Sequence, residues 1–172
     1  MRTGMTGSLL LVAIFCGTTL AASPDWVDEG FTPIFDGKTL DGWDGDPELW
    51  NVDDGAIHGQ TKEGQLTKNQ FIIWRGGEPG DFVLKLQFRL KNGNSGVQIR
   101  SRENVDEWGP WCMGGYQVDM DAANTYTGGV YEERAGRGVM PFRGKNCFCD
   151  ENGKFHSDDS FADDAQLKKV IK

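Results

Sequence analysis

Residues 94–138 read NSGVQIRSRENVDEWGPWCMGGYQVDMDAANTYTGGVYEERAGRG, and they contain three strand-like runs, 94–102, 114–121 and 127–138. In the first two runs apolar and polar residues alternate. Because successive side chains of a strand point to opposite faces of a sheet, each strand is predicted to bury one face. The other face would carry acids, amides and a guanidinium. This is the layout of a groove for a polar ligand.

Further strand candidates precede this region, with turn signals between them. Residues 49–60 predict a hairpin, because Asp54-Gly55 suits a tight two-residue turn. The clearest alternation lies in residues 81–93, DFVLKLQFRLKNG. Many short strands of this kind indicate an all-β, antiparallel fold, a sandwich or a barrel. We expect six apolar residues to be mostly buried: Phe82, Leu84, Leu86, Phe88, Val97 and Ile99. We expect one shared polar face to hold Gln98, Arg100, Gln117 and Asp119.

Five phrases of the chain resemble, in their order, the 3-keto-disaccharide hydrolase domain family: FTPIFDGKTLDGW (31–43), WNVDDGAIHGQ (50–60), NSGVQIRS (94–101), GYQVDMD (115–121) and TGGVYEERAGRG (127–138). The resemblance implies a concanavalin-like, laminin-G-like β-sandwich of the jelly-roll type. It also implies cleavage of glycosides already oxidised to a ketone at carbon 3 of the sugar. Members of this family continue past the point where this chain stops, so we expect the C-terminal part of the domain to be missing.

The first 22 residues have the pattern of a signal peptide, with a basic Arg2, an apolar run in residues 9–15 and small residues at Ala21 and Ala22. The apolar run is too short to span a bilayer. We therefore expect export to the periplasm or the medium. Residues 23–172 are predicted to form one domain with no transmembrane segment.

The chain is acidic, with 18 basic and 26 acidic residues and a formal net charge of −8. Loss of Arg2 with the leader would take this charge to about −9. A surface of this sign disfavours nucleic acid and anionic lipid as partners. The partner that the resemblance implies is a carbohydrate substrate, a 3-keto-glycoside.

The cysteines leave several alternatives open. A lipoprotein anchor at Cys16 is disfavoured because a bulky residue precedes it. In an exported protein a disulfide is expected, and Cys112 could pair with Cys147 or with Cys149, whereas a bond between the last two would be strained. A zinc set of these three thiols with His156 is less favoured, because the C-x-C spacing is unlike that of zinc knuckles.

The reaction that the resemblance implies has its own chemical demands. A ketone at carbon 3 acidifies the hydrogen on carbon 2, so a base can remove this hydrogen and an enolate forms. The group on carbon 1 then leaves by elimination, and water adds to the enone. The site needs a base near carbon 2 and a stabiliser for the enolate oxygen. Ordinary glycosidases instead use two carboxylates across the bond.

Four residues are candidates for these catalytic roles. Glu132 or Asp119 is predicted to act as the base, and Arg100 to hold the enolate oxygen. Arg100 could instead form a structural pair with Asp119. His58 can move protons near neutral pH, although a histidine at the end of a hairpin strand is more often structural.

Substrate contacts are predicted for polar residues of the strand faces and for two tryptophans of a Gly-Pro loop: Gln98, Gln117, Asp121, Trp108, Trp111 and Arg137. Exposed indole rings stack on sugars, but tryptophan also fills sandwich cores, and we expect one ring in each role. No metal ligands are assigned, although Asp119 with Asp121 could order a divalent metal such as calcium. The alternative function is a noncatalytic carbohydrate-binding module with the same groove.

Overall fold

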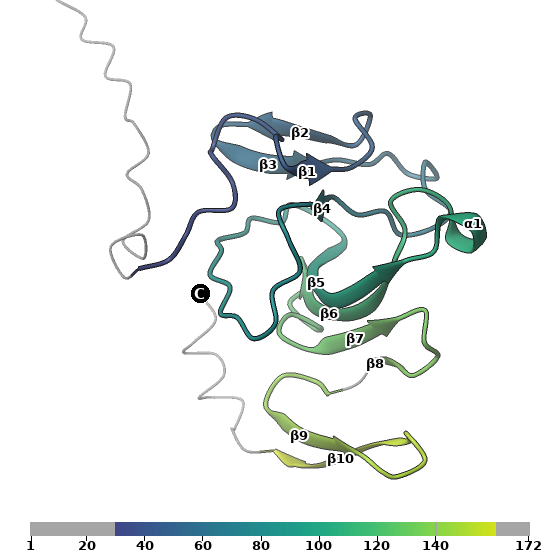
Figure 1. The fold of residues 1–172 in the computed structure, drawn as a ribbon. Coiled ribbons are helices and arrows are strands. Elements are labelled where there is room, and N and C mark those ends of the chain that lie inside the picture. The colour runs from purple at the N-terminus through teal and green to yellow at the C-terminus, as the bar shows by residue number, and fades with distance from the viewer. Residues whose placement is uncertain (1–29, 140, 161–172) are drawn as a thin grey trace, which may run out of the picture. The chain divides into compact units, whose positions relative to one another are not determined.

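The computed structural model describes residues 30–139 and 141–160 (Figure 1). The chain divides into two units, residues 1–33 and residues 34–172. Of the first unit only residues 30–33 are described, so every strand and helix named here belongs to the second. The predicted signal peptide lies outside the described residues. In the described ranges no helix is long and apolar enough to cross a membrane.

The elements are strands almost throughout, and every strand pair is antiparallel. They are β1 (Trp43–Asp44), β2 (Trp50–Asp53), β3 (Ala56–Gly59), β4 (Ile73–Trp74), β5 (Asn94–Glu103), α1 (Val105–Trp108), β6 (Met113–Asp121), β7 (Val130–Glu133), β8 (Gly138–Val139), β9 (Lys145–Cys149) and β10 (Phe155–Ser160). β5, β6, β7 and β8 form a four-stranded sheet in that order, and β1–β4, β2–β3 and β9–β10 form three pairs. The predicted all-β, antiparallel fold is confirmed, whereas the jelly-roll strand order stays a prediction.

The β2–β3 hairpin follows directly from its turn residues. Asp53 pairs with Ala56, so only Asp54 and Gly55 form the loop. Both loop residues have positive φ angles, 48° and 73°. This is the requirement of a type I′ turn, whose twist matches that of the flanking strands. The hairpin prediction is confirmed.

The turn between β6 and β7 fixes the register of the central sheet. Asp121 ends β6, and its carboxylate accepts hydrogen bonds from the backbone N–H groups of Thr125, Tyr126 and Thr127 at 3.1, 2.9 and 3.1 Å. The Thr127 hydroxyl also accepts a hydrogen bond from the Asp121 N–H at 3.0 Å. An aspartate that holds its own turn in this way replaces hydrogen bonds that a ladder would supply.

The register divides the four-stranded sheet into two faces. Gln98 pairs with Gln117, Gln117 with Tyr131, and Gly96 with Asp119. Paired residues share a face, so one side, which we call the polar face, carries Gln98, Gln117, Asp119, Tyr131 and Glu133. The opposite side, which we call the second face, carries Val97, Ile99, Tyr116, Val118, Val130 and Glu132. The predicted common face for Gln98, Gln117 and Asp119 is confirmed.

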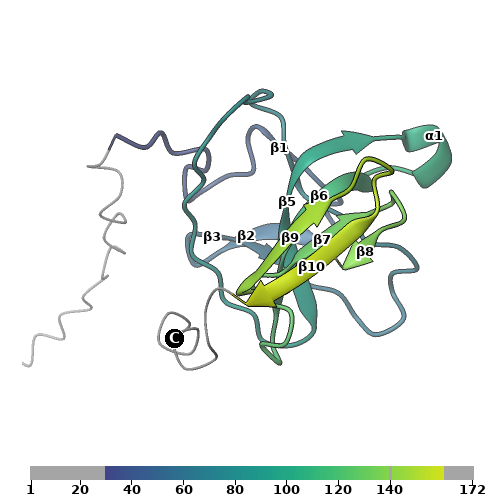
Figure 2. The same ribbon diagram turned by 90° about the horizontal axis from the view of Figure 1, so that it is seen from below.

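The β9–β10 hairpin lies next to β7 and β8, at the edge of the four-stranded sheet that is remote from β5 (Figures 1 and 2). Its strands pair Cys149 with Phe155 and Phe148 with His156. The rings of Phe148 and His156 stack, with centroids 5.1 Å apart. A hydrogen bond joins this hairpin to the residues around β8, from Arg137 Nη1 to Cys149 Sγ at 3.0 Å.

The prediction for residues 81–90 is wrong. They form no strand, and Phe82, Leu84, Leu86 and Phe88 are 43, 41, 41 and 53% exposed. Alternation within one segment indicates which side chains share a face, but a strand also needs a neighbour for its ladder. No strand among the described residues pairs with this segment. Val97 and Ile99, whose strand has a neighbour, are half-buried.

Candidate functional site

The polar face holds a buried carboxylate with one oxygen fixed. Gln117 Nε2 donates to Asp119 Oδ1 at 2.7 Å, and both side chains are 7% exposed. Among the described residues, no group donates a hydrogen bond to the second oxygen, Oδ2. A carboxylate that is oriented through one oxygen and available through the other can accept a proton from a bound ligand.

Gly96 explains why Gln117 can reach Asp119. Gly96 lies opposite Asp119 in the register. A Cβ added at Gly96 would lie 2.5 Å from Gln117 Cγ and 2.6 Å from the carbonyl oxygen of Val118. The Gln117 side chain therefore passes over the glycine on its way to the carboxylate. A side chain at this position of the NSGV motif would block that path.

Gln98, the neighbour of Gln117 on the polar face, has an amide with unmet hydrogen-bonding capacity. Its Oε1 and Nε2 atoms are both buried, and neither has a hydrogen-bond partner among the described residues. A buried polar group without a partner costs about 1–3 kcal/mol, and native proteins leave few of them. Both atoms therefore keep their hydrogen-bonding capacity for a group that reaches them.

A second acid of the polar face is Glu133, which is not one of the predicted site residues. It lies opposite Gly115, is 8% exposed, and accepts a hydrogen bond from Asn69 Nδ2 at 3.0 Å. Alternation within residues 127–138 separates Glu132 from Glu133, but it does not tell which of the two shares a face with Asp119. Only the cross-strand register, set by the turn after Asp121, decides this.

Glu132 lies on the second face, opposite Tyr116, so it is not brought together with Asp119. Arg137 binds both of its oxygens: Nε donates to Oε2 at 2.8 Å and Nη2 donates to Oε1. The Arg137 backbone N–H also donates to Oε2, at 3.2 Å, and Arg137 Nη2 donates to the Tyr116 hydroxyl at 2.9 Å. These bonds from Arg137 hold the pKa of the Glu132 carboxyl below its ordinary value. A carboxylate so engaged is a weak base.

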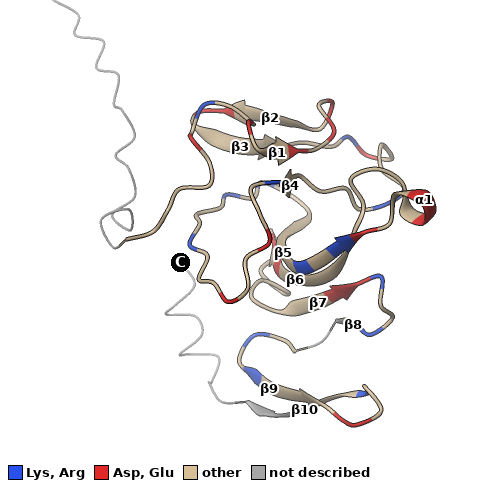
Figure 3. Ribbon diagram, viewed as in Figure 1, with Lys and Arg blue, Asp and Glu red and all other residues tan. Residues whose placement is uncertain are grey.

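Figure 3 shows the two acids on β7 and basic residues on β5. The acidic strand thus presents one carboxylate to each face of the sheet. Arg137, a predicted substrate contact, forms an ion pair with Glu132 on the second face.

The Glu132–Arg137 pair predicts an acid-dependent loss of stability. A lowered pKa in the folded state means that the ionised pair stabilises the fold above the ordinary carboxyl pKa, and that this stabilisation is lost as the pH falls through the folded-state value. Glu132→Gln should therefore lower Tm most near neutral pH, with a difference that shrinks below about pH 4. Thermal unfolding followed by circular dichroism across this range measures it. Glu63→Gln, the same change at an exposed site, is the control. A Tm difference independent of pH would contradict the assignment.

Arg100 lies at an irregularity in the pairing of β5 with β6, whereas Asp119 pairs with Gly96 in the regular part. The pairing shifts between Ile99, opposite Tyr116, and Arg102, opposite Gly114, so Arg100 lies in a β-bulge. Its φ angle is 51°. A bulge inserts an extra residue and interrupts the alternation on which the prediction rested. The guanidinium is 55% exposed and meets Asp81 Oδ1 at 3.3 Å. The regular pairing of the polar face therefore ends before Arg100, and the predicted role of Arg100 stays a prediction.

Two further predicted residues have structural contacts. His58 lies on the β2–β3 hairpin, which does not pair with the four-stranded sheet, and its Nδ1 is 3.1 Å from Asn51 Oδ1. The structure does not bring His58 together with the polar face. The Asp121 carboxylate holds the turn after β6, so both its oxygens are already engaged.

The two tryptophans of the Gly-Pro loop differ in their surroundings. Trp108 is 7% exposed, and the guanidinium groups of Arg102 and Arg134 lie over its ring, 5.5 and 5.1 Å from the centroid. The indole N–H of Trp111 donates to Asp44 Oδ1 at 2.7 Å. Trp108 thus takes the core role expected for one of the two rings.

The predicted disulfide is not formed. Cys112 is a buried free thiol before β6, and Cys147 and Cys149 are exposed free thiols on β9. Cys149 Sγ instead accepts the hydrogen bond from Arg137 Nη1. In residues 30–139 and 141–160, no group of three or more His, Cys, Asp or Glu is placed to hold a metal ion.

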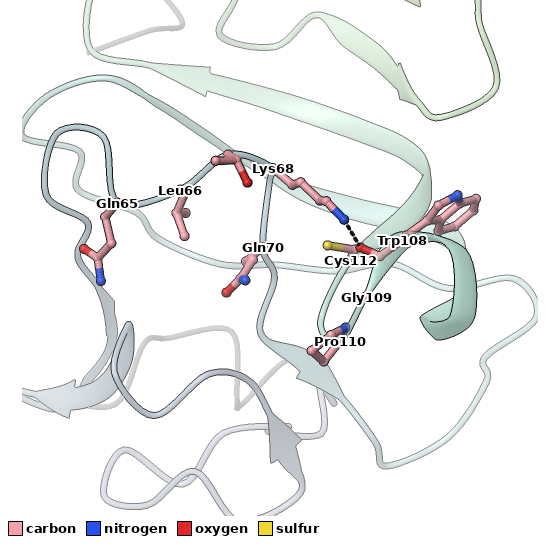
Figure 4. A pocket seen from close by; sticks show the side chains of 9 residues that line it. Gln65, Leu66, Lys68, Gln70, Trp108, Gly109, Pro110 and Cys112 are labelled. Atoms are coloured by element: carbon pink, nitrogen blue, oxygen red, sulfur yellow. Dashed lines mark hydrogen bonds between the residues drawn. The ribbon is translucent and has the colours of Figure 1, made fainter.

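A hollow of about 170 Å³ lies next to α1 (Figure 4). Lys68 Nζ donates to the Trp108 carbonyl across it, at 2.8 Å. The hollow is lined by Gln65, Leu66, Thr67, Lys68, Gln70, Trp108, Gly109, Pro110 and Cys112. None of the polar-face residues is among them, and Trp108 is the one predicted site residue in this lining.

Comparison with protein families shows the family of this chain. The family model of the 3-keto-alpha-glucoside-1,2-lyase-like domain matches residues 30–168. The chain belongs to this family, as the five sequence phrases predicted. Searches of curated proteins and of solved structures found no match.

Proposed function

We propose that the protein is an exported enzyme that cleaves the glycosidic bond of 3-keto-glycosides by elimination and hydration. Three observations support the proposal: the family match, the buried Asp119 carboxylate with one free oxygen, and the unpartnered Gln98 amide on the same face. The signal-peptide pattern of the first 22 residues supports export.

In the proposed reaction, Asp119 takes the proton from carbon 2, and the electron pair moves into an enolate with its charge on the oxygen at carbon 3. The bond between carbon 1 and the glycosidic oxygen breaks, and the leaving group departs with a proton as an alcohol. Water then adds to the enone, with its hydroxyl at carbon 1 and its hydrogen at carbon 2. The products are the free 3-keto sugar and the alcohol, so the net change is hydrolysis.

Asp119 is the better of the two predicted bases. Its carboxylate has one hydrogen bond from a neutral amide, whereas Arg137 binds both oxygens of Glu132. A base must hold a lone pair free for the incoming proton, and the ion pair removes that freedom from Glu132. The single observation that carries the proposal is the position of Asp119 on the polar face.

The noncatalytic binding module is not favoured by the aromatic residues. Such a module would present exposed rings to the sugar, but Trp108 is buried and Trp111 is half-buried.

Substrate cleavage tests the proposed function. The protein should release glucose from 3-keto-trehalose, or the chromophore from a chromogenic 3-keto-glucoside, and should leave the unoxidised sugars intact. The difference arises because only the ketone acidifies carbon 2. Equal cleavage of both forms would indicate an ordinary glycosidase, and binding without cleavage of either would indicate a carbohydrate-binding module.

A further inference from the structure

We propose that the Gln98 amide, and not the Arg100 guanidinium, is the donor that holds the oxygen at carbon 3 of the substrate. The inference rests on the proposed function, because it names the partner of Asp119 in that reaction. Gln98 Nε2 would donate to the ketone and then to the enolate oxygen. Gln98 Oε1 would accept from a hydroxyl on an adjacent carbon.

The register places Gln98 at a suitable distance from the base. Gln98 pairs with Gln117 and Gly96 pairs with Asp119, so Gln98 and Asp119 are diagonal neighbours on the same face. Such neighbours have Cα atoms about 7–8 Å apart. The hydrogen that the base removes and the oxygen that gains charge belong to adjacent carbons. A base and a donor on neighbouring positions of one face can contact both at once, each over about 3 Å.

The amide of Gln98 is free because its neighbour is turned away. Gln117 passes over Gly96 and donates to Asp119, so it does not satisfy the amide opposite it. Both polar atoms of Gln98 are buried without a partner in the described part of the chain. A fixed donor in a buried position needs no rearrangement when charge develops on the substrate, and this is how oxyanion donors act.

Arg100 lacks these features. It lies in the bulge beyond Ile99, its guanidinium is largely exposed, and it meets Asp81 at the surface. A donor in solvent stabilises a developing charge less than one in a buried site.

Gln98→Met tests this assignment, because methionine keeps the length of the side chain and removes both polar atoms. We expect kcat on the chromogenic 3-keto-glucoside to fall by about 10²–10³. Tm should stay level or rise, because an unpartnered buried amide is replaced by an apolar group. Gln98→Glu, which keeps the shape, removes the donor and adds a negative charge, should lose at least as much activity. Gln60→Met, the same change at an exposed glutamine, is the control.

A 3-keto-1,5-anhydrohexitol separates the donor role from cleavage, because it has the ketone but no leaving group at carbon 1. Wild-type protein in D₂O should exchange the hydrogen at carbon 2, as followed by NMR, and Gln98→Met should slow this exchange by a similar factor. A structural role would instead lower Tm and leave the exchange per folded molecule unchanged.

The possible failures are distinguishable. Normal turnover and exchange in Gln98→Met, with a large loss in Arg100→Ala, would overturn the inference and leave the proposed function intact. If wild-type protein neither cleaves nor exchanges any 3-keto sugar, the proposed function fails and the donor role in catalysis fails with it. Binding of the anhydrohexitol, measured by calorimetry, then decides whether Gln98 still contacts the ligand: loss of binding in Gln98→Met supports the contact, and unchanged binding refutes it.

Discussion

Asp119→Asn is expected to lower kcat on a 3-keto-glycoside by about two to four orders of magnitude, with little change in substrate binding. Asparagine has the shape of aspartate and keeps an oxygen that can accept the hydrogen bond from Gln117 Nε2. It cannot take a proton from carbon 2. Steady-state kinetics with a chromogenic 3-keto-glucoside measure kcat, and calorimetry with an uncleavable 3-keto sugar measures binding.

Two further variants make this result specific. Asp53→Asn is the same chemical change at an exposed residue of β2 and serves as the control. Glu132→Gln tests the other predicted base: because Arg137 binds its carboxylate on the second face, its loss should act on stability more than on kcat. A large fall of kcat in Glu132→Gln, together with normal kcat in Asp119→Asn, would reverse the assignment. Loss of binding along with turnover in Asp119→Asn would show that the carboxylate holds the ligand and does not move the proton.

The sequence predicted those features that depend on neighbours along the chain. The Asp54-Gly55 turn is a two-residue signal, and the structure forms the hairpin that it predicts. The alternation in β6 is equally local, and it placed Gln117 and Asp119 on one face. Gln98 joins them because β5 has the same alternation of polar and apolar residues and its polar positions pair with those of β6. These side chains lie two positions apart in one strand, or are paired directly between two strands that both keep a regular pleat.

The features that the sequence did not predict depend on pairing between distant segments. Leu84 has a clear place in an alternating pattern, but no strand in the described part of the chain lies beside residues 81–90. Arg100 follows the alternation of β5 by counting, and a bulge interrupts the count. The choice between Glu132 and Glu133 depends on a register that changes face with a shift of one residue. In each of these cases the outcome depends on which residues pair with each other on neighbouring strands.

Trp108→Ala is expected to destabilise the protein by about 3–5 kcal/mol, the usual cost of removing a large buried aromatic side chain. Few other apolar residues are buried: in the described ranges these are Leu49, Cys112 and Met113. Gly114 is shaped to receive it, because a Cβ at that position would lie 2.8 Å from Trp108 Cη2. Removing the indole would open a cavity against β6 that no neighbouring side chain fills.

The loss would also affect two arginines. The guanidinium groups of Arg102 and Arg134 both lie over the Trp108 ring. Such cation–π contacts are stronger when the ring is shielded from water. Trp108→Phe, which keeps an aromatic face, should recover part of the stability, so the comparison separates packing volume from the cation contacts. Urea unfolding of the three proteins measures the free energies. If Trp108→Ala retained wild-type stability and lost only sugar binding, the ring would be a ligand platform and its core role would be refuted.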